Sequence, residues 1–95
     1  MSTKDAYVEK LKTQLDEWSA DIDKLEVQLR KADAELRTKV EAHIATLKVK
    51  REEARGKLAE LQHSAGDAWQ ELQKGADEAW DSIKKALAEA RKKFQ

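Results

Sequence analysis

Residues 8–36 read VEKLKTQLDEWSADIDKLEVQLRKADAEL, and the spacing of the apolar residues in this stretch decides the fold class. These residues recur at alternating steps of three and four positions, the heptad pattern of a helix that buries one face. They are Val8, Leu11, Leu15, Trp18, Ile22, Leu25, Leu29, Ala32 and Leu36. A heptad pattern sustained over this length predicts a long helix of the coiled-coil type.

The spacing changes after Leu36. The apolar stripe continues through Val40, Ile44, Leu47, Arg51, Ala54, Leu58 and Leu61. Two consecutive steps of four make a stutter across residues 36–44, which locally unwinds a left-handed supercoil. A turn that creates a helical hairpin is the alternative. Because residues 31–43 (KADAELRTKVEAH) contain no Gly, Pro, Asn or Ser, we expect one continuous helix over about 3–62, roughly 90 Å long at 1.5 Å per residue.

A second, shorter helix is expected over about 66–93. Residues 63–67 (HSAGD) interrupt the pattern, and either Ser64 or Asp67 is a candidate N-cap. An 11-residue repeat follows, because GDAWQELQKGA at 66–76 is succeeded by DEAWDSIKKAL at 77–87. This period keeps an apolar stripe nearly straight along the helix. The residues that share the stripe are Trp69, Leu72, Ala76, Trp80, Ile83, Leu87 and Phe94.

Composition agrees with an all-α protein made of one domain over residues 1–95. Charged residues make up 40% of the chain, Pro and Cys are absent, and only three Gly occur, a profile typical of long helices. The net charge of zero gives no reason to expect a nucleic-acid partner. Neither a signal peptide nor an apolar run long enough to span a membrane is visible, so the expected location is the cytoplasm.

Self-association is expected, because a lone helix would leave its apolar stripe in water. The positions predicted to form the self-association core are Val8, Leu11, Leu15, Trp18, Ile22, Leu25, Leu29, Leu36, Ile44, Leu47, Leu58 and Leu61. The cover could come from the chain's own second helix, another copy, a foreign helical protein or a lipid surface. A homo-oligomeric helical bundle is the leading hypothesis.

The charge distribution favours an antiparallel arrangement. Residues 5–35 hold nine acids against five bases, whereas residues 37–57 hold seven bases against three acids. Two long helices that cross near Leu36 would therefore place opposite charges face to face. The groups involved are Asp16, Glu17, Asp21 and Asp23 on one helix and Lys48, Lys50, Arg51 and Arg55 on the other. Arg51 lies on the apolar stripe, where its charged end either reaches solvent or meets a partner carboxylate.

The C-terminal helix suggests a second function. Its predicted interaction face consists of Trp69, Leu72, Trp80, Ile83, Leu87 and Phe94. An amphipathic helix with two Trp and a basic end could lie on an anionic membrane surface. Packing against a neighbouring helix is the alternative for these large apolar side chains.

Catalytic motifs are not apparent. Glu60 and His63 have the i, i+3 spacing that di-iron helical bundles use, but the second such pair is missing because residue 40, three positions before His43, is Val. We find no phosphate-binding Gly-rich loop and no plausible Ser, His and Asp arrangement. The sequence therefore predicts a protein without enzymatic activity, metal or cofactor.

Over essentially its whole length the chain resembles a family of small coiled-coil proteins from proteobacteria and cyanobacteria, with the more specific motifs at both ends. The matching residues are MSTKDAYVEKLKTQLDEW at 1–18, IDKL at 22–25, and the tail motif Gly66-Asp-Ala-Trp69-x-x-Leu72-x-x-Gly75 with the second Ala-Trp80. The resemblance implies a bacterial cytoplasmic protein that is associated with the stress response and has no known enzymatic activity. It implies no catalytic or ligand-binding residues.

Overall fold

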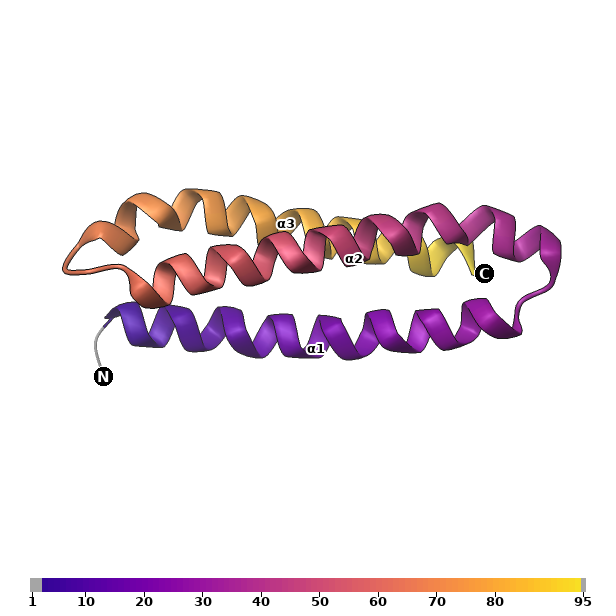
Figure 1. The fold of residues 1–95 in the computed structure, drawn as a ribbon, viewed down its shortest axis with the longest axis horizontal. Helices are drawn as coiled ribbons and strands as arrows, with labels where there is room; N and C mark the ends of the chain where they lie inside the picture. The colour runs from indigo at the N-terminus through magenta and orange to yellow at the C-terminus, as the bar shows by residue number, and fades with distance from the viewer. Residues whose placement is uncertain (1–2, 95) are drawn as a thin grey trace.

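The computed structural model describes residues 3–94 as three helices that run up, down and up (Figure 1). They are α1 (Thr3–Lys31), α2 (Ala34–His63) and α3 (Ala68–Lys93). The bundle is elongated, with extents of 51, 19 and 17 Å. No strand occurs within residues 3–94, so the all-α prediction is confirmed for them. Met1, Ser2 and Gln95, at the ends of the predicted domain, lie outside the described residues.

The prediction of one continuous helix over 3–62 is wrong, because the chain reverses at Ala32 and Asp33. Asp33 has φ −71° and ψ 172°, and its carboxylate accepts a hydrogen bond of 2.8 Å from the backbone N–H of Leu36. This N-cap satisfies one of the donors left free where a helix begins. The hairpin alternative therefore holds, although the turn precedes the stutter. The stutter itself lies within α2, where Val40 and Ile44 are buried.

The predicted break at residues 63–67 is confirmed, because α2 ends at His63 and α3 begins at Ala68, two residues after the predicted start. Ser64 ends α2, with its hydroxyl donating a hydrogen bond of 2.7 Å to the carbonyl of Leu61. Asp67 occupies the N-cap position of α3 without a side-chain cap hydrogen bond. Gly66 has φ +55°, a left-handed conformation that Gly adopts without the steric cost that other residues have.

Two glycines give a matched test of this backbone effect. A Cβ added at Gly66 or at Gly56 would meet no atom within 4 Å, but only Gly66 has positive φ. We expect Gly66→Ala to lower the free energy of unfolding by about 1 kcal/mol. Gly56→Ala, in the middle of α2, should raise it by about 0.5–1 kcal/mol. Urea denaturation measures both, and an equal effect of the two substitutions would contradict this account.

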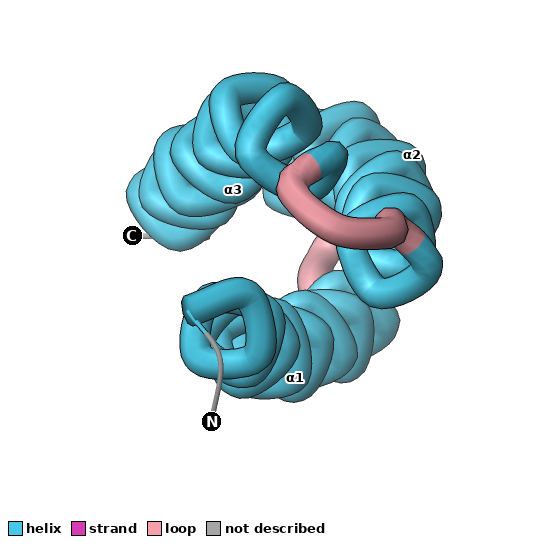
Figure 2. Tube along the Cα trace, turned by 90° about the vertical axis from the view of Figure 1, so that its left-hand side faces the viewer, coloured by secondary structure: helices cyan, strands magenta, loops and turns pink. Residues whose placement is uncertain are grey.

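The three helices are unevenly spaced around the core. Seen along the bundle, α2 lies close to both neighbours, whereas α1 and α3 stand further apart (Figure 2). Large side chains bridge the α1–α3 interface: the rings of Tyr7 and Trp69 lie 5.8 Å apart, and the indole N–H of Trp80 donates a 3.0 Å hydrogen bond to the carbonyl of Leu11. The large aromatic side chains of α1 and α3 thus fill the wider space between these two helices.

None of the three helices combines the length and apolar character needed to cross a membrane, as judged over residues 3–94.

Candidate interaction surfaces

The residues predicted as a self-association core lie in the interior of a single chain. Those that are buried are Leu11, Leu15, Ile22, Leu25, Ile44, Leu47, Leu58 and Leu61. Those that are half-buried are Val8, Trp18, Leu29 and Leu36. They divide into two packed clusters along the bundle, and Trp18 contacts both. The chain's own helices therefore cover the stripe, which was one of the alternatives that the sequence left open.

The predicted C-terminal interaction face is also occupied within the chain. Trp69, Trp80, Ile83 and Leu87 are buried, and Leu72 and Phe94 pack against the core as half-buried residues. Their partners come from α1 and α2 and include Leu15 and Leu47. In this conformation the face is closed to any outside partner.

Opposite charges meet across the helices, in part as the sequence suggested. Asp23 of α1 pairs with Arg51 of α2 at 3.4 Å, one of the expected combinations. Glu26 pairs with Lys48, and the hydrogen bond from Lys48 lowers the pKa of Glu26. Asp21 instead pairs with Arg91 of α3 at 2.7 Å, a contact that sequence reasoning missed. These pairs join α1 to both other helices within one chain.

Arg51 is the one place where a charged side chain enters the apolar stripe of α2. Its side chain is 15% exposed, and its guanidinium reaches the largely exposed Asp23. The Nε atom is buried without a hydrogen-bond partner. Arg51 thus combines the two predicted arrangements: its aliphatic stem is buried, and its charged end meets a carboxylate near the surface.

Replacing Arg51 with an apolar side chain should stabilise the bundle. Arg51→Met keeps a long flexible chain in the same space and removes the unpaired Nε, so we expect a gain of about 1 kcal/mol in the free energy of unfolding. Chemical denaturation compared with Arg55→Met is the measurement, because Arg55 is exposed and pairs with Glu52 on its own helix. A loss of more than about 1 kcal/mol in Arg51→Met would show that the ion pair is net stabilising.

Tyr7 connects α1 to α3, which run parallel, at one end of the bundle. Its hydroxyl donates a hydrogen bond to the carboxylate of Asp77 and lies 3.3 Å from the carbonyl oxygen of Gln73. Burial, followed by the hydrogen bond to Asp77 and the charge of that carboxylate, raises the pKa of Tyr7 far above its usual value. No spacing signal predicts this contact, because the partners are 70 positions apart in the sequence.

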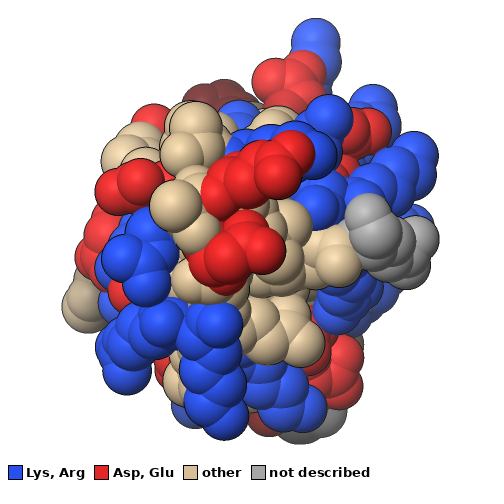
Figure 3. Space-filling model, turned by 90° about the vertical axis from the view of Figure 1, so that its right-hand side faces the viewer, with Lys and Arg blue, Asp and Glu red and all other residues tan. Residues whose placement is uncertain are grey.

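The opposite end of the bundle gathers positive charge. Lys39 and His43 of α2 lie beside Lys92 and Lys93 of α3 around a surface hollow of about 390 Å³. Figure 3 shows groups of Lys and Arg side chains over this end, with acidic groups between them. Lys39 lies 3.7 Å from Glu35, and Lys92 lies 3.7 Å from Glu89. Only the basic end of α3 was apparent from the sequence, since Lys39 and His43 come beside it through the antiparallel packing of α2 and α3.

Metal ligands do not converge anywhere in the part of the chain that the structure describes, where no group of three or more His, Cys, Asp or Glu could hold an ion. Glu60 and His63 are both exposed at the end of α2. Exposed large apolar side chains among residues 3–94 are limited to Val27 and Val49, which lie on different helices. The outer surface therefore consists mainly of charged helix faces.

No family model, curated protein or solved structure matches this chain. The resemblance to small bacterial coiled-coil proteins therefore rests chiefly on the motifs at the two ends of the chain.

Proposed function

We propose that this chain is a non-enzymatic structural or interaction protein that self-associates through its helices. The supporting observation is the way α1 and α2 meet: two antiparallel helices with three–four apolar spacing, joined by the Asp23–Arg51 and Glu26–Lys48 ion pairs. Contacts of this kind serve equally well between helices of different chains, because they use side chains only and do not depend on the connection. The chain would then act as a scaffold or adaptor.

The biological setting of this proposal comes from the resemblance alone. A bacterial cytoplasmic location and a role in the stress response are what the two ends of the chain suggest.

Sedimentation velocity over a wide concentration range tests self-association directly. One chain has a mass of 10.8 kDa, so a dimer or larger species is readily distinguished from a monomer. We expect an elongated species of at least two chains, whose share of the total protein increases with concentration. A monomer at every concentration, including the highest at which the protein stays in solution, would reject self-association.

Binding to an anionic membrane surface is the second candidate, and the α1–α3 interface is the observation that favours it. The two helices stand apart and are bridged by aromatic side chains, and α3 ends in Arg91, Lys92 and Lys93. A membrane would have to draw α3 out of the bundle, because its apolar face is buried. Amphipathic helices with basic residues bind interfaces by this combination of apolar burial and charge.

Vesicle flotation tests the membrane candidate. The chain should float with anionic vesicles and not with zwitterionic ones, and the paired substitution Lys92→Glu and Lys93→Glu should weaken flotation, since both side chains are exposed. Tryptophan emission is a poor readout here because Trp69 and Trp80 are already buried. Absence of flotation with anionic vesicles would reject the candidate.

A further inference from the structure

The connection between α1 and α2 is short and has no residue with positive φ. It contains only Ala32 and Asp33. Asp33 has φ −71°, close to the value of about −63° in an α-helix, so at this residue the departure from the helix lies in ψ, which is 172°. No residue other than Gly has positive φ within residues 3–94. At Asp33 the turn therefore differs from a straight helix mainly in ψ, and both conformations are ones that residues other than Gly adopt.

The residues on both sides of this connection favour a helix as well. Residues 31–43 lack Gly, Pro, Asn and Ser, and the apolar stripe passes through the connection from Leu29 to Leu36, seven positions later. The connection between α2 and α3 differs, because residues 64–67 include Gly66 at φ +55°. Of the two connections, the first is the one whose residues favour a continuous helix.

We propose that Ala32 and Asp33 form a hinge, and that two copies of this chain associate by straightening it and exchanging α1. The proposal rests on the self-association proposed above and names its partner, a second copy of the same chain. In the exchanged dimer, α1 of one copy packs on α2 and α3 of the other. Exchange of an identical element is a low-cost route to a dimer.

The contacts that α1 makes away from the hinge can be restored in the exchanged dimer, whereas the hydrogen bond from Arg37 to the carbonyl of Arg30 across the hinge is lost. The restored contacts include the hydrogen bond from Trp80 to Leu11, the hydroxyl of Tyr7 on Asp77, and the ion pairs of Asp21, Asp23 and Glu26 with α2 and α3. The difference between the two states therefore concentrates at the hinge, where the N-cap of α2 is exchanged for continuous helix.

The hinge end of the bundle also gains from exchange. Leu29 and Leu36 flank the hinge and are only half-buried in the single chain. In a straight helix they lie on one face, because seven residues complete nearly two turns. Two such helices that run antiparallel through the hinge bring these leucines of both copies together and remove more of their surface from water.

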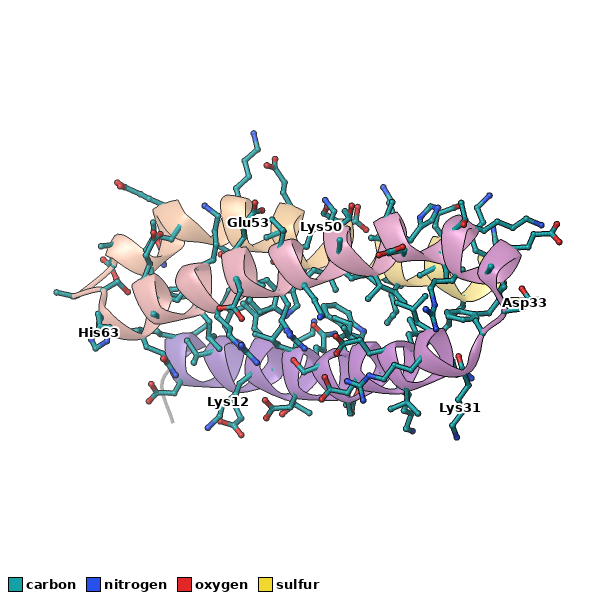
Figure 4. All side chains as sticks on the ribbon, turned by 45° about the vertical axis from the view of Figure 1, so that its right-hand side comes forward. Lys12, Lys31, Asp33, Lys50, Glu53 and His63 are labelled. Atoms are coloured by element: carbon teal, nitrogen blue, oxygen red, sulfur yellow. The ribbon has the colours of Figure 1, made fainter. Side chains whose placement is uncertain are left out.

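Pulsed spin-label distance measurements within one chain distinguish the two states. Lys12 and Glu53 are exposed and lie at a similar level of the bundle, on α1 and α2 (Figure 4). Labels on Lys12→Cys and Glu53→Cys should be about 20–25 Å apart in the closed chain, roughly two helix diameters, and about 60 Å apart along a straight helix. The chain has no native Cys, so labelling is specific. Refolding at high concentration with excess unlabelled chain leaves at most one labelled chain in most dimers, so the measured distance is the one within a chain. Size-exclusion chromatography then separates monomer from dimer for the measurement of each.

Hinge variants shift the equilibrium in a predictable direction. Asp33→Ala removes the cap of the closed form and adds a better helix former to the straight form. We expect the equilibrium between the closed and the straight hinge to shift about tenfold toward the straight form. Because a dimer contains two hinges, its association constant should rise about a hundredfold. Asp33→Asn retains a capping side chain and should change it by only a few fold. Asp67→Ala is the matched control, because Asp67 occupies the other N-cap position without a cap hydrogen bond.

The outcomes separate this proposal from the broader one. A dimer with the long intrachain distance, enriched in Asp33→Ala, supports exchange. A dimer that keeps the short distance overturns exchange while self-association stands. If Asp33→Ala folds, as judged by circular dichroism, and stays monomeric at all concentrations, both proposals fail.

Discussion

Trp80→Ala is expected to lower the free energy of unfolding by about 3–5 kcal/mol, the range found for removal of a large buried aromatic side chain. Trp80 is 4% exposed and packs in the cluster that joins α1, α2 and α3. It also fills the space between α1 and α3, the two helices that stand furthest apart. For a domain of this size the loss is a large share of a total stability of about 5–15 kcal/mol. Thermal and urea denaturation monitored by circular dichroism measure it.

Trp80→Phe separates packing from hydrogen bonding at the same site. It retains an aromatic ring but removes the indole N–H that donates to the carbonyl of Leu11. We expect a loss of about 1–2 kcal/mol, made up of one hydrogen bond and a small void. If Trp80→Ala cost no more than Trp80→Phe, the ring would not be the main support of the α1–α3 interface.

Leu47→Ala should be among the most harmful aliphatic truncations in α2, with an expected loss of about 2–5 kcal/mol. Leu47 is 0% exposed and belongs to the cluster that also contains Ile22 and Leu87, so its side chain meets both other helices. Such close packing leaves little room for neighbours to close the cavity. Urea denaturation of the purified variant gives the difference from the shift of the midpoint.

Val49→Ala is the natural control for this substitution. Val49 lies two residues further along the same helix, yet it is 58% exposed. Its truncation should change the free energy of unfolding by less than about 0.5 kcal/mol, as is usual for surface positions. A cost comparable to that of Leu47→Ala would mean that the outer face of α2 is covered by another chain in solution.

Many positions on the predicted apolar stripe are core residues of the single chain, although the prediction assigned them to contacts between chains. The positions picked from the stripe, such as Leu15, Ile22 and Leu47, are buried, since a helix with this spacing has only one face to bury. Small residues were harder to recognise. Ala90 is fully buried in α3 but was not predicted, because alanines occur on every face of these helices and only the approach of a neighbour distinguishes one from another.

Cross-helix contacts were predictable only where charge blocks faced each other. Asp23 and Arg51 were matched in advance, although between two chains rather than within one. Asp21 with Arg91, and Tyr7 with Asp77, could not be matched, because each pair joins α1 to α3 across about 70 positions. Their meeting depends on how far apart the two helices stand, which apolar periodicity does not specify.

The sequence by itself determined that this protein is helical, where its last helix lies, and which side chains must leave water, because periodicity and composition act locally along the chain. The tertiary structure decided whether the first sixty residues form one helix or two. Residues 31–43 favour a helix by local propensity, yet the chain turns at Ala32 and Asp33. The physical reason is that reversal covers the stripes of α1 and α2 within one chain, a gain in burial that exceeds the modest cost of a two-residue break.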